Sequence, residues 1–220
     1  MGISDIEAVM ALITKVARSG ERTLIAIAGP PGSGKSTLAE AVVKQLNSRV
    51  GSEPLAALIP MDGFHLDNQD LDKQGLLSRK GAPETFDAAG LVRLVRRIRT
   101  GGTDIHYPLF DRTIDRCQVD AGLLSAETPI VVVEGNYLLL DDSPWNALAG
   151  LFDATVFLAP AVEVLEERLI HRWLRYGFSP EMAAEKARAN DLRNARLVLE
   201  KSLAADLLLT QQTDETENVP

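Results

Sequence analysis

The residues most clearly suited to chemistry form a glycine-rich run that ends in a lysine and a serine. The spacing G-x-x-x-x-G-K-S is complete in Gly29, Pro30, Pro31, Gly32, Ser33, Gly34, Lys35 and Ser36. Glycines let backbone N–H groups turn toward an anion, and a helix N-terminus adds its positive dipole end. The Lys35 ammonium suits the β- and γ-phosphates of a nucleotide, the Ser36 hydroxyl suits Mg²⁺, and Thr37 suits an inner phosphate. The spacing therefore predicts a nucleoside triphosphate site with a bound Mg²⁺.

The segments on either side of this loop favour the same interpretation. The apolar run 23–28 predicts a buried parallel strand, and the apolar spacing over 36–50 predicts a helix. A strand, a glycine loop and a helix in this order are the context that the phosphate-binding motif requires. The alternative, a Gly/Pro turn that precedes a helix by coincidence, is disfavoured by this context.

Two acidic residues directly follow two other apolar runs. Asp62 follows the run 55–61, and Glu134 follows the run 130–133. Ligands of an open α/β sheet bind at the carboxyl ends of its strands, so we expect one crevice to hold Lys35, Ser36, Asp62 and Glu134. Asp62 is our candidate for the base that orients an acceptor hydroxyl, and Glu134 for a Mg²⁺ ligand, directly or through water, although these roles are exchangeable. Taken alone, each acidic residue with its following glycine is an ordinary turn or strand end.

Three arginines share one face of a predicted helix over 162–175, namely Arg168, Arg172 and Arg175. A break follows at Gly177, and Ser179 then reads as the N-cap of a helix over 180–190 with Pro180 at its first position. This pattern predicts a helical lid around 168–185, in which Arg168 and Arg172 contact the nucleotide phosphates and Arg172 takes part in catalysis. The alternative is a solvated face whose arginines pair with nearby glutamates.

The elements that must position these residues alternate along the chain. Besides those above, strands are expected over 155–159 and 206–209 and a helix near 87–99. This alternation predicts an α/β fold with a mostly parallel sheet, built as one domain over 1–210. The segments 62–84 and 101–128 lack clear periodicity and are long for plain connections, which is typical of functional loops. The polar segment 211–220 reads as a disordered tail.

Composition limits the partners of the protein. The chain has 220 residues and a formal net charge of −8, without a basic tail, which argues against a nucleic-acid partner. No apolar run approaches the length of a membrane span, so we expect a cytoplasmic protein without a membrane partner. The amphipathic segment 1–20 packs either on its own core or on a second subunit in a homodimer. Cys117 is the only cysteine, and His65, His106 and His171 show no metal-ligand spacing.

The chain resembles the uridine kinase, pantothenate kinase and phosphoribulokinase family of P-loop small-molecule kinases. The matching stretches, in the family's order and over most of the chain, are GPPGSGKST (29–37), MDGFHLDN (61–68), KGAPETFD (80–87), YPLFDR (107–112), VVVEGNYLLL (131–140) and NDLRNARLV (190–198). Together they are most similar to a bacterial subgroup named nucleoside-kinase-like or fructose transport system kinase. The resemblance implies a three-layer P-loop NTPase fold with a five-stranded core sheet, a helical lid, and ATP with Mg²⁺.

The same resemblance implies roles for individual residues. Lys35, Ser36 and Thr37 match the phosphate and Mg²⁺ positions, Asp62 the catalytic aspartate, Glu134 the acidic residue on the metal side, and Arg172 the lid arginine. Acceptor-side candidates are His65, Lys80, Phe86, Tyr107, Asp111, Arg112 and Asn194, together with Asp62 and Glu134. The chain departs from uridine kinases at Trp173, where those enzymes commonly have an aspartate after the lid arginine. Its 107–112 stretch is also shorter than the acceptor segment of pantothenate kinases.

These features predict an ATP-dependent phosphotransferase that acts on a hydroxyl of a small metabolite, such as a nucleoside, a sugar or a pantothenate-like compound. The charged groups of Asp111 and Arg112 suit an acceptor with several hydroxyls, and Arg112 is also consistent with a phosphorylated one. The alternative is a regulator of sugar transport that binds a nucleotide and a metabolite. A P-loop hydrolase or GTPase is disfavoured, because no guanine-reading NKxD stretch is evident and the acceptor motifs would go unexplained.

Overall fold

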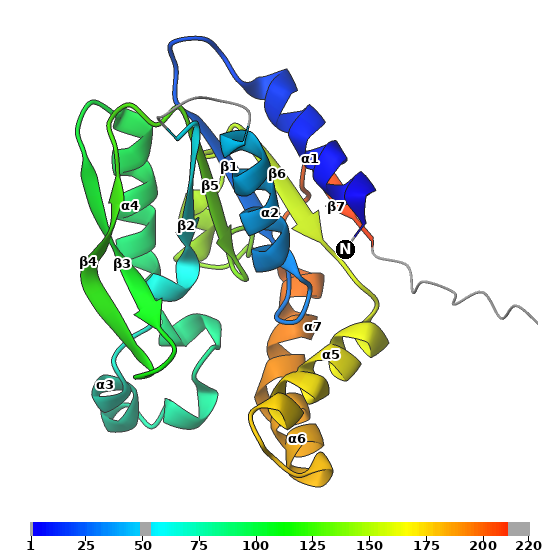
Figure 1. Ribbon diagram of the computed structural model, residues 1–220. Helices are drawn as coiled ribbons and strands as arrows, with labels where there is room; N and C mark the ends of the chain where they lie inside the picture. Colours follow the sequence, from blue (N-terminus) through cyan, green and yellow to red (C-terminus); the bar gives the residue numbers. More distant parts are fainter. Residues whose placement is uncertain (1, 49–53, 211–220) are drawn as a thin grey trace, which may run out of the picture.

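The computed structural model describes residues 2–48 and 54–210 (Figure 1). Its centre is a parallel sheet of five strands in the order β2-β5-β1-β6-β7. The strands are β1 (Thr23–Ala28), β2 (Ala56–Pro60), β5 (Ile130–Gly135), β6 (Ala154–Leu158) and β7 (Leu207–Leu209). Strands β1 and β5 are buried along their whole length, as expected of apolar runs covered on both faces. The predicted α/β class and the five parallel core strands are confirmed.

Register in this sheet brings the acidic strand ends together. Glu134 of β5 pairs with Ile27 of β1 on one side and with Pro60 of β2 on the other. The phosphate loop begins directly after β1, and Asp62 follows β2 by two residues. Parallel strands end at a common edge, so this register alone places the loop, Glu134 and Asp62 side by side.

Helices cover both faces of the sheet and complete three layers. On one face lie α1 (Ile3–Val16) and α2 (Lys35–Asn47), whose buried side chains join those of β1 and β6. On the other lie α4 (Ala88–Thr100), the short η4 (Trp145–Leu148) and the segment 137–140. Helix α1 buries Val9, Met10 and Ile13 on its own core, which is the first of the two packings expected for the segment 1–20. None of the helices in the described residues is long and apolar enough to span a bilayer.

The two segments without clear periodicity contain regular structure. Residues 101–128 hold an antiparallel hairpin of β3 (Ile105–Asp111) and β4 (Arg116–Leu124), which forms a separate two-stranded sheet. The alternation of β4 is poor because six of its nine residues are exposed, and the register shifts between Tyr107 and Leu109. Residues 61–87 hold α3 (Asn68–Lys73) and three short turns, η1 (Met61–Phe64), η2 (Leu77–Arg79) and η3 (Pro83–Thr85).

The C-terminal helices gather at the carboxyl edge of the sheet, across from α3 (Figure 1). They are α5 (Val162–Arg175), α6 (Pro180–Lys186) and α7 (Leu192–Lys201), with the π-helical turn η5 (Ala187–Asp191) between α6 and α7. Ser179 caps α6 through its side chain, as predicted. The predicted helix over 180–190 ends as an α-helix at Lys186, and α7 was not predicted from the sequence. The predicted tail 211–220 and the end of the predicted helix 36–50 lie outside the described residues.

Candidate functional site

The phosphate loop joins β1 to α2 in a backbone path that requires glycine. Gly32 and Gly34 have φ values of +82° and +88°, in the left-handed region, and Gly34 is the residue at the N-cap of α2. A Cβ on Gly29 would lie 2.9 Å from the carbonyl oxygen of Leu158 in β6. The loop is therefore held against the sheet, with the N-terminus of α2 directed at whatever anion it binds.

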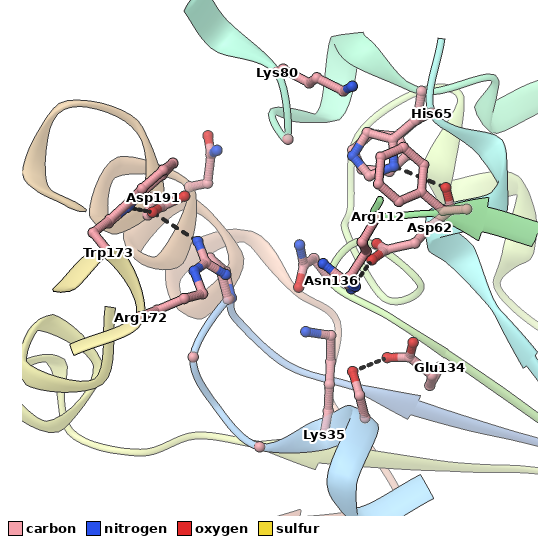
Figure 2. A pocket seen from close by; sticks show the side chains of 18 of the residues that line it. Lys35, Asp62, His65, Lys80, Arg112, Glu134, Asn136, Arg172, Trp173 and Asp191 are labelled. Atoms are coloured by element: carbon pink, nitrogen blue, oxygen red, sulfur yellow. Dashed lines mark hydrogen bonds and ion pairs between the residues drawn. The ribbon is translucent and has the colours of Figure 1, made fainter. Parts of the chain in front are cut away.

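Lys35 occupies the centre of the site. Its side chain extends from the first turn of α2 toward Asn136 and Arg112 (Figure 2). Burial lowers the pKa of Lys35, while the carboxylates of Glu134 and Asp62 raise it and the guanidinium of Arg172 lowers it further. A partly desolvated ammonium among these groups interacts strongly with a polyphosphate, because little solvent screens it.

Ser36 and Glu134 form an oxygen pair suited to a divalent cation. The Ser36 hydroxyl donates to Glu134 Oε2 at 3.0 Å, and Glu134 is only 6% exposed. No group of three or more His, Cys, Asp or Glu residues within 2–48 and 54–210 could enclose a metal by itself. Mg²⁺ is commonly held by one or two protein oxygens together with phosphates and water, so this pair fits it.

Replacement of Glu134 by glutamine is expected to change the pH dependence of stability in the metal-free protein. Burial raises the pKa of Glu134 above its ordinary value, against the opposing effects of Lys35 and Ser36. A carboxyl whose pKa is raised by folding stabilises the protein below its unfolded-state pKa of about 4.3, and this contribution is lost as pH rises through the folded-state pKa. The unfolding free energy of the wild type relative to Glu134→Gln should therefore fall with rising pH.

Urea unfolding in the presence of a chelator measures this difference at a series of pH values. The exposed Glu40 on α2 provides the control, since Glu40→Gln should show no such trend. A wild-type-minus-variant difference that stays constant with pH for Glu134→Gln would contradict the assignment of a buried carboxyl whose pKa is raised by folding.

Asp62 lies in η1, where its carboxylate faces the site. Arg112, the first residue of the β3–β4 hairpin turn, contacts Asp62 Oδ2 through one guanidinium nitrogen at 2.7 Å. The next residue, Gly63, packs against β3 so closely that a Cβ would lie 2.1 Å from the carbonyl oxygen of Pro108. The hairpin thus fixes both the backbone beneath Asp62 and the orientation of its carboxylate (Figure 2).

Aromatic rings form one wall beside Asp62. The His65 ring lies 4.0 Å from that of Phe86 and 4.8 Å from that of Phe110, centroid to centroid. His65 Nδ1 donates to the backbone carbonyl of Asp62 at 2.9 Å, and burial lowers the pKa of the ring, which favours its neutral form. Its other nitrogen, Nε2, is then a hydrogen-bond acceptor. Lys80 lies over Phe110 at 5.1 Å and contacts Asp115 Oδ2 at 2.8 Å, so the wall carries a cation at its rim.

The opposite wall comes from the C-terminal helices. Arg172 of α5 contacts Asp191 of η5 at 2.8 Å, and the Trp173 indole donates to the same oxygen at 2.7 Å. Arg168 donates to the carbonyl oxygens of Gly32 and Ser33 at 3.4 Å, which holds α5 to the phosphate loop.

A second set of contacts joins the two walls across the site. Arg79 donates to Asn190 Oδ1 at 2.6 Å and to Asn194 Oδ1 at 3.4 Å. Asn190 in turn donates to the carbonyl oxygen of Lys80 at 2.8 Å. The segment 61–87 and the C-terminal helices are therefore bonded to each other beside the site.

A cavity of about 490 Å³ lies between these walls, and most of the residues predicted from the sequence line it. They are Pro31, Gly32, Gly34, Lys35, Ser36, Thr37, Asp62, His65, Lys80, Phe86, Arg112, Glu134, Arg172 and Asn194. Gly29, Pro30 and Ser33 belong to the same loop and do not line the cavity. Arg168 contacts that loop without lining the cavity.

The structure does not bring Tyr107 and Asp111 into the cavity. The Tyr107 hydroxyl donates to the carbonyl oxygen of Leu58, and its ring packs on Gly122 inside the core. Asp111 accepts from Thr113 and Gln118 on the exposed side of the hairpin. Both positions support the hairpin that carries Arg112, and we leave them out of the acceptor set.

Sequence reasoning missed several residues of the cavity, namely Gly81, Phe110, Asp115, Asn136, Trp173, Tyr176 and Asp191. Asn136 follows Glu134 by two residues at the end of β5, so the rule that placed Glu134 would have found it. Asp191 lies in the stretch 190–198, where the family resemblance implies a role only for Asn194. Asp115 lies in the turn of a hairpin that the sequence did not reveal.

Comparison with known proteins gives the same family for the chain. The model of the phosphoribulokinase/uridine kinase family matches residues 24–188. A Schizosaccharomyces pombe protein named "Putative uridine kinase C227.14" is 37% identical over 200 residues, covering 87% of this chain and 84% of the relative. The pantothenate kinase of Streptomyces coelicolor is 32% identical over 162 residues, covering 71% of this chain and 49% of that enzyme.

Among solved structures, the crystal structure of a "putative fructose transport system kinase" from Silicibacter sp. TM1040 is 40% identical and superposes with a TM-score of 0.86, covering 92% of this chain and 98% of that one. The fold, the phosphate loop and these matches agree with one another. The chain belongs to the phosphoribulokinase/uridine kinase family and is a kinase that acts on a small molecule.

Proposed function

We propose that this chain transfers the γ-phosphoryl group of ATP to a hydroxyl of a small metabolite of the nucleoside, sugar or pantothenate-like type. The observation that carries the proposal is the single cavity that Lys35, Ser36, Glu134 and Asp62 share with an aromatic wall. Phosphoryl transfer requires the nucleotide and the acceptor to meet in one cavity, where positioned charged groups stabilise the transferring phosphoryl group. In this proposal residues 168–185 form the lid. We place the protein in the cytoplasm.

Asp62 is the proposed base. Its carboxylate accepts a hydrogen bond from the acceptor hydroxyl, whose oxygen attacks the γ-phosphorus. The bond from the γ-phosphorus to the β–γ bridging oxygen breaks as the new oxygen–phosphorus bond forms, the hydroxyl proton passes to Asp62, and ADP leaves. Arg112 holds the carboxylate in place through its 2.7 Å contact.

Charge on the transferring group meets cations from two sides. Lys35 lies at the start of α2, and Arg172 enters from the end of α5, opposite the acceptor wall (Figure 2). Ser36 and Glu134 would hold Mg²⁺, which neutralises phosphate charge when bound. Positioned cations of this kind act most strongly where water is excluded.

The acceptor side supports a ring-bearing or polyhydroxylated compound. The rings of His65, Phe86 and Phe110 offer an apolar surface, while Lys80 and Arg112 supply donors at its edge. Apolar faces with a few directed polar groups are typical of small-molecule sites. The relatives are named for uridine, pantothenate and a fructose transport system, which sets the range of acceptors to examine.

A coupled assay of ADP release with MgATP tests the proposal against nucleosides, pantothenate, pentoses, hexoses and their monophosphates. One acceptor is expected to raise ADP release far above the acceptor-free rate. A metabolite that binds tightly by calorimetry yet yields no phosphorylated product would contradict phosphoryl transfer and favour the regulator of sugar transport.

A further inference from the structure

Two consecutive residues of α5 donate to a single carboxylate oxygen. Arg172, through Nη2, and Trp173, through its indole nitrogen, donate to Asp191 Oδ2 at 2.8 and 2.7 Å. The side chain of Asp191 is only 13% exposed, and all three residues line the cavity. Figure 2 shows this junction facing Lys35 from across the site.

The local backbone is unusual where Asp191 lies. Residues Ala187–Asp191 form a π-helical turn between the α-helices α6 and α7. A π turn contains more residues per turn than an α-helix, so it changes which side chains face the neighbouring helix, and such turns are common at functional sites. Here the turn presents Asn190 to the acceptor wall and Asp191 to Arg172.

The carboxylate of Asp191 is not needed merely to join these elements. Arg188, in the same turn, contacts Glu166 of α5 at 2.6 Å on the outer surface. Burial of the Asp191 carboxylate also costs desolvation energy. Its presence beside the cavity therefore calls for a role other than joining α5 to η5.

Electrostatics in the cavity supply that reason. Arg172 and Lys35 are both cations, and the repulsion between them lowers the pKa of Lys35. Before phosphates bind, this repulsion favours movement of Arg172 away from the site. The Nε of Arg172 is buried and has no hydrogen-bond partner among residues 2–48 and 54–210, so Asp191 is the anion that retains the guanidinium there.

We propose that Asp191 is a positioning residue that holds Arg172 aimed at the transferring phosphoryl group. The inference rests on the proposed function, since it assigns Asp191 to the machinery of that same reaction. Asp191 acts through Arg172 and touches neither nucleotide nor acceptor in this scheme. Its loss therefore weakens contacts made to the transferring group and leaves those to the bound diphosphate intact.

Calorimetry with MgADP, in the presence and absence of aluminium fluoride, tests this without an acceptor. ADP with aluminium fluoride mimics the transferring phosphoryl group, so the wild type should bind the pair more tightly than MgADP alone. In Arg172→Ala, the gain in affinity produced by aluminium fluoride should be smaller by about 10²- to 10³-fold. Asp191→Asn should lose about 100-fold, because a small misplacement of a directed group has an effect of that size, while its affinity for MgADP alone stays unchanged.

Glu166→Gln is the matched control, since it removes another ion pair between α5 and η5 without touching Arg172. It should keep the full fluoride response. The double variant Asp191→Asn/Arg172→Ala should lose no more than Arg172→Ala alone, as expected of residues that act through one another.

The outcomes separate the inference from the proposed function. A fluoride response in Asp191→Asn equal to that of the wild type, alongside its loss in Arg172→Ala, would overturn the positioning role alone. The absence of any fluoride response in the wild type would contradict phosphoryl transfer at this site, and the inference with it. Equal losses in Asp191→Asn and Glu166→Gln would assign Asp191 to the packing of the helices.

Discussion

Asp62→Asn is expected to lower kcat for the acceptor by about 10²- to 10⁴-fold, the range for removal of a general base. The amide keeps the shape of the side chain and cannot take the proton from the acceptor hydroxyl. The Kd for MgATP should stay unchanged, because the phosphate loop and the Ser36–Glu134 pair do not depend on Asp62 for their contacts. Steady-state kinetics and calorimetry on the same preparation measure the two quantities.

Asp70→Asn is the control for this variant. Asp70 lies on α3, in the same acceptor-side segment, and pairs only with the exposed Lys73 among the ionic contacts of the described residues. It should retain wild-type turnover. If Asp62→Asn turned over the acceptor as fast as the wild type, Asp62 would have no role as the base, and its exchange with Glu134 would become the alternative.

Lys35→Met is expected to lower kcat/KM by about 10²- to 10³-fold, as seen when one directed donor to a transition-state oxyanion is removed. The ammonium lies in one cavity with Glu134 and Asp62, so methionine fills a similar space without supplying charge. Affinity for MgATP should fall as well, because the ground-state phosphates lose the same contact.

The exposed Lys44, near the end of the same helix α2, gives the matched control Lys44→Met. It changes the net charge equally and should leave both kcat/KM and the Kd for MgATP unaltered. Equal effects of the two replacements would mean that Lys35 acts only through the overall charge of the protein, which would contradict its place in the site.

Most of the candidate site could be predicted because its parts lie at the carboxyl ends of the strands of a parallel sheet. The glycine, lysine and serine spacing in residues 29–37 directly predicts a phosphate-binding loop. The apolar patterns on either side predict the strand before it and the helix after it. Asp62 and Glu134 were found from one rule, that strand ends meet at one edge, and the register of β5 with β1 and β2 places them there.

The remaining cavity residues depend on packing that local pattern does not encode. Phe110 and Asp115 belong to a hairpin whose second strand is mostly exposed and so lacks a clean alternation. Tyr107 is the opposite case. The family resemblance implied an acceptor contact for it, but its ring packs in the core against Gly122. Asp191 lies in a π turn where it contacts Arg172, and apolar periodicity gives no sign of such a turn.

The central claim is that this cavity moves a phosphoryl group from ATP to an acceptor oxygen. The most direct test uses ATP labelled with heavy oxygen throughout its γ-phosphate, incubated with the acceptor found in the ADP-release assay, and mass spectrometry of the products. We predict an acceptor phosphate that carries three heavy oxygens, formed by the wild type and formed at least about 100-fold more slowly by Asp62→Asn. Heavy label found only in inorganic phosphate, with the acceptor unmodified, would contradict the claim.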